Sequence, residues 1–165
     1  MGSTYVVEDA GTWHMFYTYV FDWLTVRGRQ EPIYHIRHAT SPDGIRWTKS
    51  GRIAIPQKHP EEAVARATIV RRDGLWHMWF CYRGSQNFRG GEDSYRIGYA
   101  SSENLLDWDR QDHLSGIDVS ESGWDSEMIT YPCVVEQGER LIMFYNGNHF
   151  GTSGFGYAVS AESGS

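Results

Sequence analysis

The sequence predicts an all-β fold, a partial β-propeller of about three four-stranded antiparallel blades with the first and last incomplete. Aromatic residues make up 15% of the 165 residues, and aromatic side chains favour strands. The 18 glycines suit tight turns between short strands. Most importantly, one pattern occurs three times: Met15, Met78 and Met143 each precede two aromatic residues and are 63 and 65 residues apart.

Each repeat has the same internal order of predicted elements. An apolar run predicts the first strand, and a glycine turn and a run ending in Met-aromatic-aromatic predict the second. A further alternating run predicts the third strand, and the Asp43-Gly44 pair predicts a hairpin that leads to a fourth strand near Trp47. The fourth strand recurs only once, near Trp108. We therefore expect a single domain, 1–165, with blade-like units at about 3–51, 63–112 and 127–161.

The propeller explains how such short sheets can be stable. One four-stranded sheet cannot bury both of its faces, but several sheets stacked around an axis can. An ordinary β-sandwich is the alternative, and it does not account for three repeats in the same order. About three blades are too few to close a ring, and unpaired strand edges should therefore remain at both ends. We expect a homo-oligomer that forms through these open blade edges, edge to edge or face to face.

Composition excludes several classes of function. The 15 basic and 21 acidic residues give a net charge of −6, and no basic stripe is visible, so we expect no nucleic-acid partner. No apolar stretch is long enough for a membrane span. Cys81 and Cys133 lie in apolar strand patterns and are predicted to be buried thiols. With no signal-peptide pattern, these features favour a cytoplasmic protein. The histidine and cysteine spacings match no metal site, and no cofactor motif is present.

Several runs resemble the blade repeat of the five-bladed β-propeller glycoside hydrolases, the group of families 43, 32 and 130. The runs that carry this resemblance are residues 6–9, 13–17, 34–47, 82–85, 93–100, 123–129, 131–148 and 154–158. The resemblance spans nearly the whole chain and implies roughly the last three blades of such a protein. It also implies a glycoside hydrolase-like, carbohydrate-recognising function.

The resemblance sets a test for catalysis. Glycoside hydrolysis normally uses two carboxylates, which in this group lie on the first strands. The corresponding positions here hold Ser3, Arg66 and Tyr131, and none is a carboxylate. The usual pair is therefore not evident. Glu127, where a loop enters a first strand, is the candidate general acid if burial raises its pKa. The alternatives for Glu127 are a ligand contact or a structural role in the loop.

The remaining candidates suit a hydroxyl-rich ligand, because guanidinium and amide groups form paired hydrogen bonds and aromatic faces cover C–H surface. An arginine near a propeller axis, Arg66, either contacts a ligand or pairs with Glu127. The loop residues have turn formation as their alternative role. The predicted substrate-binding residues are Arg66, Arg83, Asp93, Tyr131, Asn146 and Asn148. The alternative function is a non-catalytic protein-interaction or self-assembling module.

Overall fold

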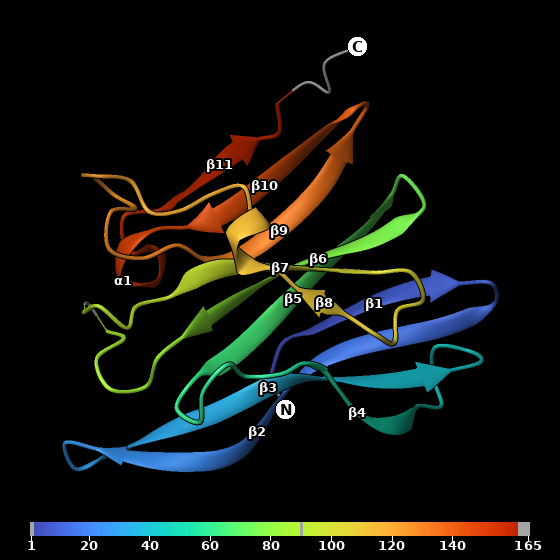
Figure 1. Cartoon of the computed structure of the whole chain (residues 1–165), viewed down its shortest axis with the longest axis horizontal. Coiled ribbons are helices and arrows are strands. Elements are labelled where there is room, and N and C mark those ends of the chain that lie inside the picture. The colour runs from blue at the N-terminus through green and yellow to red at the C-terminus, as the bar shows by residue number, and fades with distance from the viewer. Residues whose placement is uncertain (1, 90, 162–165) are drawn as a thin grey trace.

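Three antiparallel sheets lie side by side in the computed structural model, which describes residues 2–89 and 91–161 (Figure 1). The sheets follow one another along the chain, and their strands are ordered as in propeller blades. The predicted all-β, partial propeller fold is therefore confirmed.

The first sheet has the strand order β1-β2-β3-β4. Its strands are β1 (Thr4–Asp9), β2 (Thr12–Val26), β3 (Arg29–Ser41) and β4 (Thr48–Ile55). The sequence predicted an incomplete first blade, but β1 pairs with β2 over its whole length, from Thr4 opposite Tyr17 to Asp9 opposite Thr12. The first sheet therefore has four strands.

The second sheet has the order β5-β6-β7-β8, and the third has the order β11-β10-β9. The second consists of β5 (Ala63–Arg72), β6 (Leu75–Arg83), β7 (Arg96–Ser102) and β8 (Asp109–Arg110), followed by the 3-10 turn η1 (Asp112–Leu114). The third consists of β9 (Thr130–Gln137), β10 (Arg140–Asn146) and β11 (Phe155–Val159), with the short helical turn α1 (Asn148–Gly151) between the last two. Within the described residues the third sheet has three strands, as the repeat predicted.

The connection between β3 and β4 is not the predicted two-residue hairpin. It is a longer turn in which Asp43 Oδ1 accepts the N–H groups of Ile45 and Arg46 at 3.0 and 2.8 Å. Asn104 forms the same kind of turn in the second sheet. The repeat therefore includes this turn, and an Asp or Asn side chain organises it by accepting backbone hydrogen bonds.

Packing between neighbouring sheets forms the core. We call the side of a sheet that faces the following sheet its front face, and the opposite side its back face. Phe16 and Ile36 on the front of the first sheet pack with Met78 and Phe80 on the back of the second. A second cluster joins the front of the second sheet to the back of the third, where Met143 lies. The second sheet is thus covered on both faces, because a neighbour lies on each side.

The front face of the third sheet is open. Cys133 there is exposed, which corrects the prediction of a buried thiol, whereas Cys81 is buried as predicted. The prediction failed because the pattern of β9 shows only that the residue lies in a strand, not whether another sheet covers it. None of the helices in the described ranges is long and apolar enough to cross a membrane.

Candidate functional site

The innermost strands of the second and third sheets, β5 and β9, carry Arg66 and Tyr131 at the same repeat position. Both residues have left-handed backbone conformations, with φ of 59° and 58°. The pairing of β5 with β6 is irregular at this point, between Ala65 and Thr68. Such conformations cost about 1–3 kcal/mol for non-glycine residues and cluster at functional sites. The same strained position in two adjacent strands identifies the centre of the molecule as a candidate site.

Arg66 and Tyr131 line a hollow of about 240 Å³ together with Asn146, which we call the central hollow. Its other lining residues are Cys133, Phe144, Tyr145 and Phe155. The Arg66 guanidinium carbon lies 5.8 Å from the centre of the Tyr131 ring. Burial raises the pKa of Tyr131, so its phenol is neutral at pH 7 and can donate a hydrogen bond. The hollow therefore offers a cation, a phenol and an amide beside aromatic surface.

The described lining of the central hollow contains no carboxylate. Acid–base chemistry by a pair of carboxylates, as glycoside hydrolysis normally requires, is therefore not supplied by these side chains. What they can do is bind: guanidinium and amide groups donate to hydroxyl oxygens, and aromatic rings pack against sugar C–H groups.

Glu127 lies in the loop that leads into β9, and about half of its side chain is exposed. Its backbone N–H donates to Asn148 Oδ1 at 2.8 Å, and its carboxylate lies 3.8 Å from His149 Nε2. Among the described residues it forms no ion pair with Arg66. The burial that a general acid would need is absent, so a catalytic role for Glu127 stays a prediction.

Arg83 is 2% exposed, and its guanidinium is bound within the protein. It donates to the Tyr34 and Tyr95 hydroxyls at 3.2 and 3.3 Å and to the Pro32 carbonyl at 2.9 Å. It also lies 3.7 Å from the centre of the Phe88 ring. The two tyrosine hydroxyls are hydrogen-bonded to each other, and burial raises the pKa of both. Arg83 thus holds the first sheet against the second and is not presented to a ligand.

Two further predicted residues also serve the backbone around them. Asp93 accepts the Asn87 N–H at 3.1 Å and packs under Gly84, where an added Cβ would lie 2.6 Å from the Asp93 Cγ. Asn148 is buried. Its Oδ1 accepts the backbone N–H of Met128 at 3.1 Å in addition to that of Glu127. Of the predicted binding residues, the structure therefore brings together Arg66, Tyr131 and Asn146 only.

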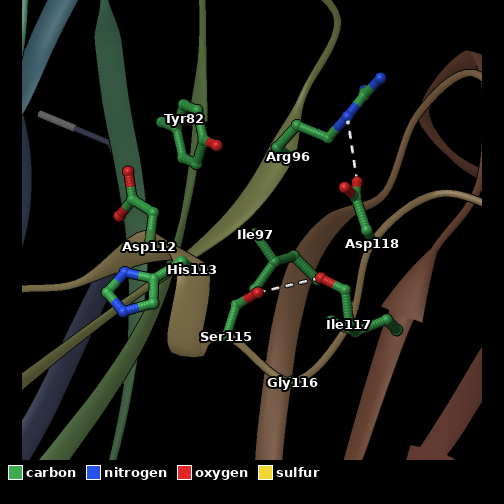
Figure 2. Close-up of a pocket in the computed structure, with 9 residues that line it drawn as sticks. All are labelled: Tyr82, Arg96, Ile97, Asp112, His113, Ser115, Gly116, Ile117 and Asp118. Atoms are coloured by element: carbon green, nitrogen blue, oxygen red, sulfur yellow. Dashed lines mark hydrogen bonds and ion pairs between the residues drawn. The ribbon is translucent and has the colours of Figure 1, made fainter.

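A larger hollow of about 560 Å³ lies beside β7 and the segment after η1 (Figure 2). Arg96 and Asp118 form an ion pair across part of it at 3.4 Å, and Asp112 and His113 lie near Tyr82 on another side. Sequence reasoning missed this hollow because residues 113–118, which supply much of its lining, lie between the predicted repeat units. The only signal there was the number of polar side chains in a short loop.

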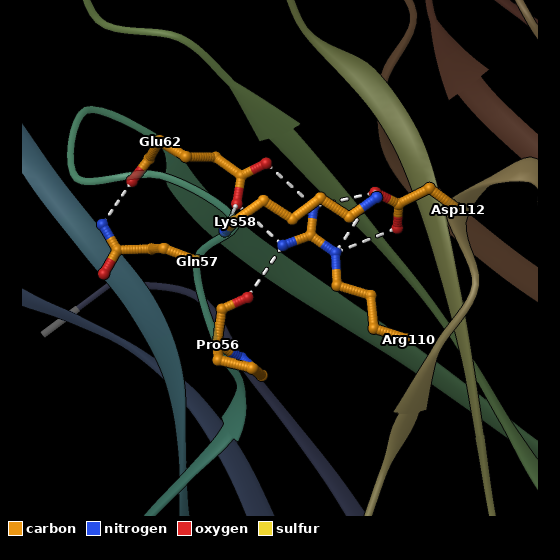
Figure 3. Close-up of polar contacts among 6 residues, drawn as sticks. All are labelled: Pro56, Gln57, Lys58, Glu62, Arg110 and Asp112. Atoms are coloured by element: carbon orange, nitrogen blue, oxygen red, sulfur yellow. Dashed lines mark hydrogen bonds and ion pairs between the residues drawn. The ribbon is translucent and has the colours of Figure 1, made fainter.

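Asp112, which lines this larger hollow, also belongs to a buried ionic network (Figure 3). The network joins Glu62, just before β5, to Arg110 in β8 and Asp112 in η1. Arg110 pairs with Glu62 at 2.7 Å and with Asp112 at 2.9 Å, and all three side chains are buried. Although burial opposes ionisation, the hydrogen bonds from Arg110 and Lys58 lower the pKa of Asp112. Because these charges satisfy one another, the network is structural, and the central hollow is the stronger candidate site.

Comparison with solved structures agrees with the sheet arrangement. Zg3597, a family 117 glycoside hydrolase of the marine bacterium Zobellia galactanivorans, matches with a TM-score of 0.73 at 20% identity, over 94% of this chain and 50% of that protein. A thermostable family-43 glycoside hydrolase matches with a TM-score of 0.72 at 18% identity, over 96% and 50%. The chain has a glycoside hydrolase-like propeller fold. At this level of identity the comparison establishes the fold alone.

The curated proteins that match by sequence include an uncharacterized protein and a named enzyme. The uncharacterized protein MT1551 of Mycobacterium tuberculosis is 39% identical over 94% of this chain and 49% of its own length. A 1,2-beta-oligomannan phosphorylase of Thermoanaerobacter is 26% identical over 76% of this chain and 40% of its own length. The chain thus spans about half the length, or less, of the curated relatives it matches. No protein-family model matches the chain.

Proposed function

We propose that this chain is a carbohydrate-binding, glycoside hydrolase-like module whose central hollow contacts sugar hydroxyls. The observation that carries the proposal is that Arg66 and Tyr131 line the same hollow. They occupy the same strained repeat position on the innermost strands of two neighbouring sheets. Backbone strain of this kind is retained where a precise side-chain position matters. Asn146 adds an amide to the same surface.

The relatives indicate which sugars to test. One relative is a 1,2-beta-oligomannan phosphorylase, so β-1,2-linked mannose oligosaccharides are the first probes, with and without inorganic phosphate. Because the central hollow has no carboxylate among its described lining residues, we expect binding without hydrolysis.

The test is a glycan array followed by calorimetric titration of the sugars that bind. Loss of one hydrogen-bonding group to a neutral ligand costs about 0.5–1.5 kcal/mol, or about 2- to 12-fold in affinity. We expect Arg66→Gln, Tyr131→Phe and Asn146→Ala each to weaken binding within this range. Arg46→Gln is the control, since the Arg46 side chain is 83% exposed and lies outside the hollow. Equal binding by all four variants, or no binding by the parent chain, would contradict the proposal.

Aryl-glycosides test catalysis separately. Turnover by the parent chain that is lost in Glu127→Gln would assign this carboxylate a catalytic role despite its exposure. Binding without turnover would support a lectin-like module.

A further inference from the structure

The larger hollow beside β7, which we call the outer hollow, belongs to the second sheet. Its lining comes from β6, β7, η1 and residues 115–118. The second sheet packs against the first sheet on one face and against the third on the other. The walls of the outer hollow therefore come from the part of the chain that has a neighbouring sheet on both sides. Its volume of about 560 Å³ is within the range of about 300–1,000 Å³ that is usual for small-molecule sites.

A long connection between two sheets builds one wall of the outer hollow. Residues 56–62 are enough to join β4 of the first sheet to β5 of the second, whereas residues 111–129 join β8 to β9. The longer connection includes η1 and residues 115–118, which line the hollow. Long connections in compact domains often carry function. The step from one sheet to the next does not require these extra residues, which indicates a role other than joining the sheets.

Hydrogen bonds hold the walls of the outer hollow in place. The carbonyl of the buried Ser115 accepts the Trp79 Nε1–H at 3.1 Å, and Ser115 Oγ donates to the Ile117 carbonyl at 2.9 Å. On another side, Arg96 Nη1 donates to the Glu127 carbonyl at 2.9 Å. Walls fixed in this way lose little conformational freedom when a ligand binds, which favours affinity.

Several polar groups in the outer hollow have no partner among residues 2–89 and 91–161. The Tyr82 hydroxyl and the His113 ring make no hydrogen bond there, and neither does Arg96 Nη2, although Arg96 Nε pairs with Asp118 at 3.4 Å. Burial raises the pKa of Tyr82, and the charge of Asp112 raises it further, so the phenol is neutral at pH 7 and can donate. Figure 2 shows Tyr82 and His113 on one side of the hollow and Arg96 and Asp118 on the other.

The groups around the outer hollow suit a neutral ligand with several hydroxyl groups. Two carboxylates and one guanidinium line it, so a phosphate or carboxylate ligand would meet a net negative surface. Arg110 and Lys58 already offset the charge of Asp112, which leaves little excess charge to attract a cation. Hydroxyl groups can donate to the free acceptors and accept from the free donors, and Ile97 and Ile117 offer apolar surface to C–H groups. A saccharide combines these two kinds of group.

We propose that the outer hollow is a second saccharide-binding site, in which the Tyr82 hydroxyl, the Arg96 guanidinium and the Asp118 carboxylate bind the hydroxyl groups of one neutral sugar residue. The choice of sugar to test first rests on the proposed function. The site itself does not, because the outer hollow and the central hollow have no lining residue in common.

The first test locates the sugar by NMR of the ¹⁵N-labelled full chain. A β-1,2-linked mannose disaccharide, or the neutral sugar that the glycan array selects, is added in steps while the backbone amide shifts are followed. We expect saturable shifts at Ile97, Gly116 and Ile117, which line the outer hollow. Arg66→Gln, a change in the central hollow, should leave these shifts and their midpoint unchanged.

The second test removes individual groups from the outer hollow. Tyr82→Phe deletes a hydroxyl that has no partner in the described chain, so it should leave the fold intact and weaken binding at the outer hollow by about 2- to 12-fold. Asp118→Ala should weaken it by about 10-fold, because a charged acceptor is lost. The matched controls are Tyr157→Phe, at a residue 68% exposed on the third sheet, and Asp107→Ala, whose side chain is 73% exposed and pairs with Arg52. Both controls should bind like the parent chain, and thermal melting checks that every variant is folded.

The outcomes separate this inference from the proposed function. Shifts at the central hollow with none at the outer hollow would overturn the inference and leave the proposed function intact. Shifts at the outer hollow alone would support the inference and contradict the central site. Unchanged affinity at the outer hollow in both Tyr82→Phe and Asp118→Ala would overturn the inference, and so would the absence of shifts there with every sugar of the array.

Discussion

The second and third sheets share their sequence pattern and strand order, but they differ in what covers them. The second lies between two sheets, so Met78 on its back face and Trp79 on its front face are both buried. In the third, Met143 is buried and Phe144 is exposed. Burial of a repeat position is therefore decided by the neighbouring sheet and not by the repeat itself. Three predictions test how burial between sheets affects stability, and they follow in order of decreasing expected effect.

The largest effect is expected at the equivalent aromatic positions. Trp79→Ala should lower the free energy of unfolding by about 3–5 kcal/mol, because it leaves a cavity between two sheets. It also removes the hydrogen bond from Trp79 Nε1 to the Ser115 carbonyl. Phe144→Ala should cost less than Trp79→Ala in the dissociated chain, because Phe144 is 37% exposed on an open face and its removal leaves no closed cavity.

Urea denaturation at low protein concentration measures both costs. Equal costs at low concentration would show that the third sheet is covered within a single chain.

The second prediction concerns pH at the junction of the first and second sheets. His38 is buried there, with its Nε2 atom 3.0 Å from His14 Nδ1. Burial, which disfavours the charged imidazolium, is the largest cause that lowers the pKa of His38 from 6.5 to about 4. Electrostatic repulsion from His14 and Arg52 lowers it further. The unfolded chain therefore binds more protons than the folded chain between these values, and stability falls as the pH decreases through this window. The expected loss between pH 7.5 and pH 5 is about 2 kcal/mol.

Denaturation curves at the two pH values measure this loss. His38→Gln should show a smaller difference between pH 7.5 and pH 5 than the parent chain. The exposed His149, replaced by Gln, should leave the difference unchanged. A parent chain that is equally stable at both pH values would contradict a depressed pKa of His38.

The smallest effect is expected at the hydrogen bonds between sheets. Thr68→Val keeps the side-chain shape but leaves the Val134 N–H without its acceptor, so it should cost about 1–3 kcal/mol. Cys133→Val, at the equivalent position of the open face, should leave the free energy of unfolding of the dissociated chain within about 0.5 kcal/mol. Thermal or urea unfolding compares the two, and a cost at Cys133 equal to that at Thr68 would contradict the open face.

Much of the fold could be predicted, because strands and turns depend on nearby residues. The alternation of side chains and the glycine turns located the strands around Met15, Met78 and Met143. The turn at Asp43 was placed correctly but given the wrong form, since its geometry depends on backbone hydrogen bonds to one carboxylate oxygen. The candidate site was predicted only in part. Arg66 and Tyr131 meet at the central hollow, whereas Arg83 is buried by aromatic residues that a linear pattern does not bring together.

Local sequence was thus sufficient to place the repeats, the strand order within each sheet and the face on which each side chain lies, because successive residues in a strand point to opposite faces. It could not indicate which of those faces another sheet covers. Only the packing of whole sheets decided that Phe16 and Trp79 are buried while Phe144 is exposed. The reason is that burial depends on contacts between residues far apart in the chain, and these contacts exist only once the sheets are assembled.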